Sequence, residues 1–565
     1  MTWRFPRQAI RSLPAPAQLL IKRGQAALRQ DDWAASIKRL RLQEQDYLNG
    51  TRDQNAARPG QRRVLFFVAQ QTPPWLEVEY SLAAALWLRG HDICGTLCDG
   101  LLPLCEMNLG RTERPPCDLC AGWLTRYEDA FGFNFSRLTQ FASWDDRLLA
   151  EQQVAGAADR DLEGLTVDTV NVGRLARREL QRYHRGFVFE PSADPAYRQW
   201  LVSAILLVRW VSRLLDREHP DVVLCASGRT LSSASLCAVA RSRDIRVVTW
   251  DTEPTFSDGL VFSHDEAAVL IPLDEAWRQA SQQPLTCDAI QALDEFLRGW
   301  ERSQTPPHPT HHATLDDHGA IRSQLGLRSD ASPIVAFANS VWDMAVVDRD
   351  LGFANMFEWL FALVEFAKRH PAIDLVVRAH PSEVNVSHDL HSRTPVGAEI
   401  VKRHGPLPGN IKLVDGLNPV DSYALAALAG VVLVYASRIG LEVALRGKQP
   451  WLAGETTYRG KGFTRDLSGT RQMCDLLDAG VTDDVLSADR IDLAQRFAYL
   501  WFFRYVTRVP LLRPLTRPFA LRTFRALGPG GDPTVDRICT SIITGAPFVD
   551  LARPPPHCES RSTSR

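Results

Sequence analysis

The sequence lacks long apolar runs and any excess of charge. Its longest apolar run, Ala424 to Ala436, has 13 residues and contains a glycine, whereas a membrane-spanning helix needs about 20. The basic N-terminus has no uninterrupted apolar core of the kind found in signal peptides. A net charge of −1 offers no electrostatic basis for nucleic-acid binding. We therefore expect a cytoplasmic protein without a nucleic-acid partner.

Two glycine-rich phosphate-binding motifs are also missing. Neither G-x-G-x-x-G nor the P-loop pattern follows a predicted strand, which argues against a dinucleotide-dependent enzyme or a P-loop NTPase. The length of 565 residues, 45% of them hydrophobic, is enough for two or more domains with ordinary cores. Strand, helix and strand patterns alternate along the chain, so we predict an α/β protein with parallel sheets.

Polar turns that follow predicted strands are concentrated between residues 374 and 463. One apolar strand pattern runs directly into Ala379-His380-Pro381, and the carboxyl ends of strands are where α/β sheets bind ligands. A later apolar run stops at the turn Ser437 to Gly440, and a helix pattern opens with Leu441-Glu442. Free N–H groups and the helix dipole point to the same place there, which predicts an anion site. The alternatives are that His380 caps a strand end and that Glu442 only caps its helix.

These motifs carry a resemblance to a known family. The residues concerned are Arg378-Ala-His-Pro, the Ser437 turn, Gly440-Leu-Glu442, Gly447-Lys-Gln-Pro450 and Tyr458-Arg-Gly-Lys-Gly-Phe-Thr464. Over roughly residues 330 to 470 the chain resembles the donor half of the bacterial capsule polysaccharide biosynthesis glycosyltransferases. That family is similar to GT-B sialyltransferases and Kdo transferases, which use CMP-activated sugars. The resemblance implies a GT-B fold, with two Rossmann-like domains facing a cleft.

The resemblance and the strand patterns together predict the domain boundaries and the site residues. We predict a helical N-terminal extension (1–60), a Rossmann-like acceptor domain with a Cys-rich insertion (61–272), a helix and linker (273–330), a Rossmann-like nucleotide-donor domain (331–490), C-terminal helices with a basic segment (491–552) and a disordered tail (553–565). The predicted nucleotide-binding residues are Asn339, Ser340, Arg378, His380, Pro381, Ser437, Arg438, Gly440 and Glu442. Among them, Glu442 is expected to bind the ribose hydroxyls.

The expected chemistry is sugar transfer with inversion and without a metal cofactor. His380 and the N–H groups near Ser437 would stabilise the charge that builds on the departing phosphate. A carboxylate of the first domain would then deprotonate the acceptor hydroxyl. A strand pattern ends at Asp251, and two further carboxylates, Glu253 and Asp258, follow in the next loop. Of these three residues we favour Glu253 as the base. The alternative is that these carboxylates are solvated or capping groups in a loop.

A cysteine cluster predicts a structural metal. Cys98, Cys105, Cys117 and Cys120 lie within 23 residues of a proline-containing loop, and thiolates at such spacing can surround one tetrahedral ion. We expect zinc rather than an iron–sulfur cluster. The alternative is a set of free buried cysteines, and a cytoplasmic location disfavours disulfides.

Two basic segments suggest contact with an anionic surface. Arg504 to Arg525 contains six arginines and no acid, which fits either a membrane-facing segment or a rim for an anionic glycan. The N-terminal helix patterns, Ala15 to Arg29 and Trp33 to Leu48, would dock at the membrane or, as we favour, pack against the following domain. Peripheral binding at the inner face of the plasma membrane would bring the protein to lipid-linked acceptors.

Three functions fit these patterns. The first is a glycosyltransferase that moves an acidic, CMP-activated sugar onto a bacterial surface polysaccharide or glycolipid. The second is a CDP-glycerol or CDP-ribitol phosphotransferase of the teichoic-acid type, which also uses a GT-B frame. The third is a non-catalytic GT-B protein of polysaccharide assembly. Product analysis separates the first two, because one forms a glycosidic bond and the other a phosphodiester.

Overall fold

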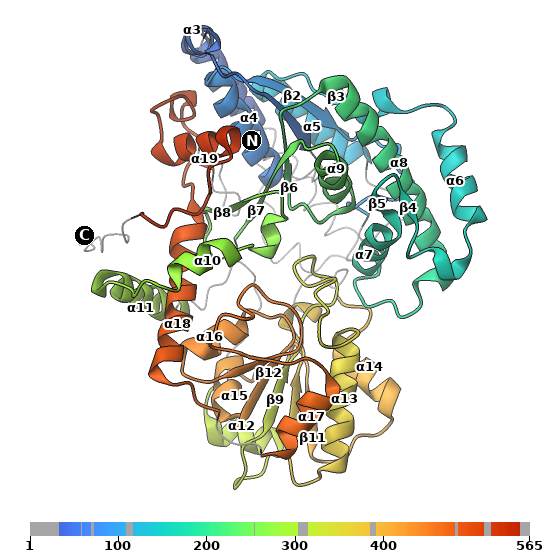
Figure 1. Ribbon diagram of the computed structural model, residues 1–565, viewed down its shortest axis with the longest axis vertical. Helices are drawn as coiled ribbons and strands as arrows, with labels where there is room; N and C mark the ends of the chain where they lie inside the picture. The colour runs from blue at the N-terminus through green and yellow to red at the C-terminus, as the bar shows by residue number, and fades with distance from the viewer. Residues whose placement is uncertain are drawn as a thin grey trace, which may run out of the picture.

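A computed structural model describes residues 33–57, 59–68, 73–108, 117–253, 255–302, 315–384, 391–480, 484–512 and 521–553. The predicted helix Ala15 to Arg29, the predicted disordered tail beyond residue 553, and Arg513 and Arg517 of the basic segment lie outside these residues. Within the described ranges, no helix combines the length and the apolar character needed to cross a membrane. The chain forms two α/β domains, the first at the top of Figure 1 and the second at the bottom.

The first domain is built on a seven-stranded sheet with the order β15-β8-β7-β6-β1-β2-β3. Its centre is parallel and consists of β1 (Arg63–Val68), β2 (Asp92–Leu97), β6 (Val222–Ala226) and β7 (Arg246–Thr252), with β3 (Ser136–Arg137) at one edge. β8 (Gly259–His264) pairs with β7 in the antiparallel sense. The central strands are almost entirely apolar because both faces of a parallel sheet are covered.

Helices cover both faces of this sheet. Val64 and Phe66 of β1 join one core and Leu65 and Phe67 join the other, as alternation along a strand requires. The first core contains residues of α3 (Gln45–Ala56), α4 (Pro73–Leu88), α5 (Cys117–Phe131) and α19 (Pro533–Thr544). The second contains residues of α6 (Asp146–Gly156), α7 (Val172–His184), α8 (Pro195–Glu218) and α9 (Leu231–Arg241). A short hairpin, β4 (Thr166–Val167) and β5 (Val170–Asn171), precedes α7.

The second domain contains a six-stranded sheet that is parallel throughout. Its order is β11-β10-β9-β12-β13-β14, with β9 (Ile334–Phe337), β10 (Leu375–Arg378), β11 (Ile411–Val414), β12 (Val431–Val434), β13 (Pro450–Leu452) and β14 (Arg465–Asp466). One face packs on α13 (Met356–Arg369), α14 (Val396–His404) and α17 (Thr470–Asp478). The other packs on α12 (His318–Leu325), α15 (Ser422–Leu428), α16 (Ile439–Leu445) and α18 (Ala488–Tyr499).

The chain crosses between the domains twice. On the way down it passes through α10 (Asp274–Ala280) and α11 (Cys287–Arg302), and on the way back through α18 and a π-helical turn at Leu500–Tyr505. It then adds β15 (Thr507–Arg508) to the first sheet beside β8, a path that Figure 1 shows on the left of the molecule. The predicted fold is therefore confirmed: the chain has the GT-B arrangement of two Rossmann-like domains with C-terminal helices that return to the first.

Candidate active site

His380 lies two residues after the end of β10 and precedes a short helical turn that begins at Pro381. Its Nδ1 accepts a hydrogen bond from the backbone N–H of Ser382 at 3.1 Å and lies 2.6 Å from the Ser382 hydroxyl. Burial, aided by the positive charges of Arg378 and Arg438, lowers the pKa of the imidazole, so the ring is neutral at neutral pH. Since Nδ1 is an acceptor, the ring proton belongs on Nε2. The ring thus offers one N–H donor to an oxygen of a ligand.

The turn that begins at Ser437 is supported from behind by Tyr458. The Tyr458 hydroxyl donates a hydrogen bond to the carbonyl of Ser437. A Cβ atom on Gly440 would lie 2.2 Å from that hydroxyl, so the close approach of α16 to Tyr458 requires glycine at this position. The helix begins at Ile439, two residues before the predicted Leu441. Part of the motif that begins at Tyr458 thus has a structural role, because it fixes the shape of the turn.

Arg438 connects the two domains. Its Nη1 donates to Glu253 Oε1 at 3.2 Å and to Thr255 Oγ1 at 2.9 Å, both in the first domain, while its Nε donates to Glu442 Oε1 at 3.2 Å. The second oxygen of Glu253 accepts the N–H of Thr255 at 2.8 Å. The second oxygen of Glu442 accepts a hydrogen bond from the Tyr423 hydroxyl at 2.8 Å. The structure thus brings the predicted base beside two of the predicted nucleotide-binding residues.

The remaining predicted nucleotide-binding side chains lie at neighbouring strand ends. Asn339 Oδ1 accepts the N–H of Ala436 at 2.9 Å, which ties the loop after β9 to the turn after β12. The buried hydroxyl of Ser340 has no hydrogen-bond partner among the described residues. Arg378 donates to the carbonyls of Asp415 and Asn418, so its guanidinium holds the loop after β11. Nucleotide binding by these residues stays a prediction.

Asp251, at the end of β7, is a second carboxylate near this site. Burial raises its pKa to about 7, and the negative charge of Asp343 in the opposite domain contributes to the increase. Asp343 also acts on the pKa of His380, so these three side chains share one region between the domains. A carboxyl with a pKa near 7 suits general-base catalysis. The sequence pattern places Asp251 beside Glu253 but favours Glu253, because burial is not visible in a sequence.

The loop between β9 and α13 is held to the first domain by an arginine clamp, which consists of Arg174, Arg178, Arg229 and Asp348. Arg229, buried after β6, donates to the carbonyl of Met344 at 3.2 Å and to that of Val347. Arg174 and Arg178 of α7 both donate to Asp348 Oδ2, Arg174 at 3.0 Å. The Asp348 side chain is 8% exposed, that of Arg178 12% and that of Arg174 55%. The sequence gives no sign of the clamp, since its contacts join residues at least 115 positions apart.

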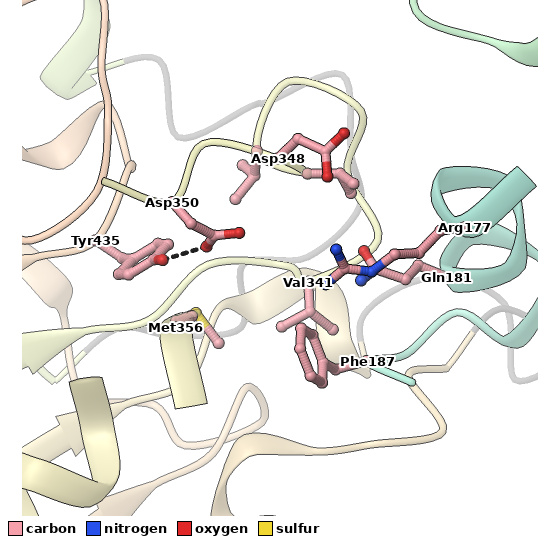
Figure 2. Close-up of a pocket in the computed structure, with 10 residues that line it drawn as sticks. Arg177, Gln181, Phe187, Val341, Asp348, Asp350, Met356 and Tyr435 are labelled. Atoms are coloured by element: carbon pink, nitrogen blue, oxygen red, sulfur yellow. Dashed lines mark hydrogen bonds between the residues drawn. The ribbon is translucent and has the colours of Figure 1, made fainter. Parts of the chain in front are cut away.

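A pocket lies beside the clamp, between α7 and the loop after β9 (Figure 2). The first domain contributes Arg177, Gln181 and Phe187 to its lining, and the second domain contributes a larger share that includes Asp350 and Tyr435. The Tyr435 hydroxyl donates a hydrogen bond to Asp350, marked by the dashed line in Figure 2. The empty volume is about 360 Å³, part of it open to solvent. Sequence patterns missed this pocket, because its two walls are distant in the chain.

The predicted metal site finds no support in the geometry. Cys98, Cys105 and Cys117 are partly buried and Cys120 is buried. Burial raises the pKa of Cys98 and Cys120 to about 12 and also raises the pKa of the other two thiols. Across the described ranges, no group of three or more His, Cys, Asp and Glu side chains is placed to hold a metal ion. Zinc in this loop stays a prediction that elemental analysis would test.

Two exposed arginines in the described part of the basic segment lie over aromatic rings of the protein. Arg508 pairs with Asp258 and lies 4.3 Å from the ring centroid of Phe256. Arg525 lies 4.3 Å from the ring centroid of Tyr47 in α3. Asp258, one of the three candidate carboxylates, thus has a structural partner. Membrane association through this segment stays a prediction.

Comparisons with known proteins find similarity in structure only. The sequence matches no protein-family profile and no curated protein. The similar solved structures include two of KpsC from Thermosulfurimonas dismutans. The beta Kdo 2,7 transferase has 15% sequence identity and a TM-score of 0.32, and the match covers 56% of this chain and 88% of that one. The beta Kdo 2,4 transferase has 12% identity and a TM-score of 0.33, with 52% of this chain and 83% of that one covered. They also include the UDP-GlcNAc 2-epimerase of Neisseria meningitidis, with 12% identity and a TM-score of 0.22, where the match covers 77% of this chain and 98% of that one. The fold assignment rests on the strand order and connections described above.

Proposed function

We propose that this protein is a nucleotide-sugar-dependent glycosyltransferase that acts on a bacterial surface polysaccharide or glycolipid. One observation carries the proposal: a neutral histidine with an available N–H, an arginine and two carboxylates from the opposite domain are grouped between two Rossmann-like domains. Donors for a departing phosphate and acceptors for a proton are what sugar transfer requires. A CMP-activated acidic sugar is the proposed donor, following the sequence resemblance.

In the proposed reaction the acceptor hydroxyl attacks the anomeric carbon while the bond from that carbon to the phosphate oxygen breaks. His380 Nε2–H and the Arg438 guanidinium donate hydrogen bonds to the phosphate, and these bonds strengthen as its negative charge grows. A carboxylate across the cleft takes the proton of the attacking hydroxyl. Attack on the face opposite the phosphate inverts the anomeric centre, and protein groups supply all the charge stabilisation.

Two carboxylates, Glu253 and Asp251, are the candidate bases for the acceptor hydroxyl in this proposal. Glu253 is ion-paired with Arg438. A donor phosphate that binds Arg438 in its place would free the Glu253 carboxylate to act as a base. Asp251, whose pKa burial raises to about 7, has the proton affinity of a base that works near neutral pH. Glu442, whose oxygens accept hydrogen bonds from Arg438 and Tyr423, would bind the ribose hydroxyls in this proposal.

A donor screen tests the proposal. The purified protein is incubated with CMP-, CDP-, UDP- and GDP-linked sugars and with CDP-glycerol, and nucleotide release is measured with and without glycan acceptors. We expect release from a CMP-linked sugar and formation of a glycosidic product. Transfer of glycerol phosphate instead, or no turnover of any donor by folded protein, would contradict the proposal.

Substitution of His380 adds a residue-level test. His380→Ala should lower turnover about thirty- to a thousand-fold, since losing one donor to a developing charge costs roughly 2 to 4 kcal/mol in the transition state. His318→Ala is the matched control, because His318 is exposed at the start of α12. A folded His380→Ala protein with unchanged turnover would withdraw the assignment of this histidine.

A further inference from the structure

The pocket between α7 and the loop after β9 contains the features of a sugar site that is selective for charge. We propose that it binds a sugar ring bearing a carboxylate, which comes either from the acceptor glycan or from the donor. The assignment of this ring to a transfer reaction rests on the proposed function. Binding itself does not depend on turnover, so the two can be tested separately.

The walls of the pocket suit one face of a sugar ring. Phe187 is fixed by ring contacts with Phe189 and Phe357, with centroids 4.9 Å and 5.6 Å away. Val341, which is buried, lies next to it in the lining (Figure 2). Such apolar surfaces pack against the C–H face of a sugar, while a few polar groups fix its orientation. The Gln181 amide is such a group.

The donor groups of the pocket favour an anion. Arg177 Nη1 pairs with Glu163 at 2.6 Å, but its Nε is buried and has no hydrogen-bond partner among the described residues. Because Nε has no surface open to a ligand, a ligand oxygen would meet the Nη2 end of the guanidinium, for which no hydrogen bond with the described residues is found. Figure 2 shows the Arg177 guanidinium beside the Gln181 side chain. Together the guanidinium and the amide could donate to both oxygens of one carboxylate.

The charged groups around the pocket also bear on the kind of ligand it binds. Burial is the main cause that lowers the pKa of the neighbouring Arg229 to about 9, and the positive charges of Arg178, Arg349 and Arg174 add to the shift. Asp348 is paired with Arg174 and Arg178. Asp350 accepts a hydrogen bond from the Tyr435 hydroxyl, which partly compensates its negative charge, and burial raises its pKa. A carboxylate-bearing ring therefore fits better than a neutral one.

Saturation-transfer NMR measures this binding without any reaction. The probes are methyl β-D-glucuronide and the neutral methyl β-D-glucoside, which differ only at the carboxylate, each titrated to roughly 10 mM, ten times above a millimolar dissociation constant. We expect binding of the glucuronide alone. Arg177→Gln and Gln181→Leu should each weaken it about tenfold, the usual effect of losing a hydrogen bond to a charged group. Arg160→Gln, at a side chain that is 88% exposed in the same domain, is the matched control.

Each result of this experiment bears on the proposal. No glucuronide binding, equal binding of the glucoside, or binding unaffected by both pocket substitutions in folded protein would overturn it. Saturating CMP-N-acetylneuraminate separates the two sources: displacement of the glucuronide indicates a donor-sugar site, and simultaneous binding indicates an acceptor site. If the cytidine signals show no saturation transfer, the proposed donor fails while the glucuronide result stands.

Discussion

Removing the carboxylate at the centre of the arginine clamp should loosen the contact between the domains. Burial raises the pKa of Asp348, but the charges of Arg178 and Arg174 outweigh it and hold the pKa below its usual value. The pair is therefore ionised at neutral pH. Asp348→Ala leaves the largely buried Arg178 close to Arg229 without this counter-charge.

The exposure of each member sets the expected cost. Deleting one partner of a buried ion pair costs roughly 3 to 5 kcal/mol, so Asp348→Ala and Arg178→Ala should each destabilise by about 3 kcal/mol. Arg174 is 55% exposed, and an exposed pair contributes only about 0 to 1 kcal/mol. Arg174→Ala is therefore the matched control within the same clamp.

Calorimetry and small-angle X-ray scattering together test this order. For a domain of this size, 1 kcal/mol corresponds to about 2 to 4 °C in Tm, so the first two variants should lower the earliest transition by roughly 6 to 12 °C and Arg174→Ala by less than about 4 °C. A larger radius of gyration should accompany the loss, because the clamp joins the domains. If Arg174→Ala proves as costly as Arg178→Ala, exposure does not decide the energetics and the reasoning fails.

Three further predictions concern the candidate active site. Gly440→Ala should weaken donor binding and cost roughly 1 to 3 kcal/mol of stability through overpacking, and adding Tyr458→Phe should recover part of it; thermal melts that show no loss would contradict the clash. The rate of nucleotide release should fall about tenfold per pH unit below pH 7, because a base whose pKa is raised to about 7 is protonated there. Asp251→Asn should slow release and abolish this pH dependence. If the variant keeps the same pH dependence, Asp251 is not the base. Glu442→Ala should raise the donor KM and leave kcat nearly unchanged, since ribose contacts are alike in ground and transition states; an equal loss in kcat would assign Glu442 to the chemical step.

The centres of both sheets are predictable from the sequence, and their edges are not. The apolar run at residues 221–226 predicts β6, found at Val222–Ala226, and the pattern at residues 92–97 predicts β2. Buried parallel strands are short continuous apolar runs, which makes them visible. β8 begins where the sequence predicts only a loop at Asp258-Gly259, and β15 lies within the basic segment with two residues. Strands that short have no periodicity to detect.

The candidate site divides in the same way. His380 and Ser437 are predictable because each lies within three residues of the end of an apolar strand, and strand ends meet at one edge of a parallel sheet. That Arg438 reaches Glu253, 185 positions away, follows only from how the two domains pack. The pocket beside Arg177 depends on the same packing. Contacts between domains come from tertiary geometry, which a local pattern of residue types does not encode.

The return of the chain to the first domain has a consequence for its synthesis. Among the described residues, the strand that pairs with the outer edge of β8 is β15, opposite Gly259 and Leu260. The second sheet, residues 334–466, is made in between and is continuous in sequence. At about 5 to 20 residues per second, roughly 10 to 50 s pass between the translation of residue 264 and that of residue 507. During that interval the nascent chain exposes an unpaired strand edge, the kind of surface that recruits another chain. A chain that terminates just before residue 507 would thus contain every strand of the second sheet while the edge of the first sheet stays unpaired.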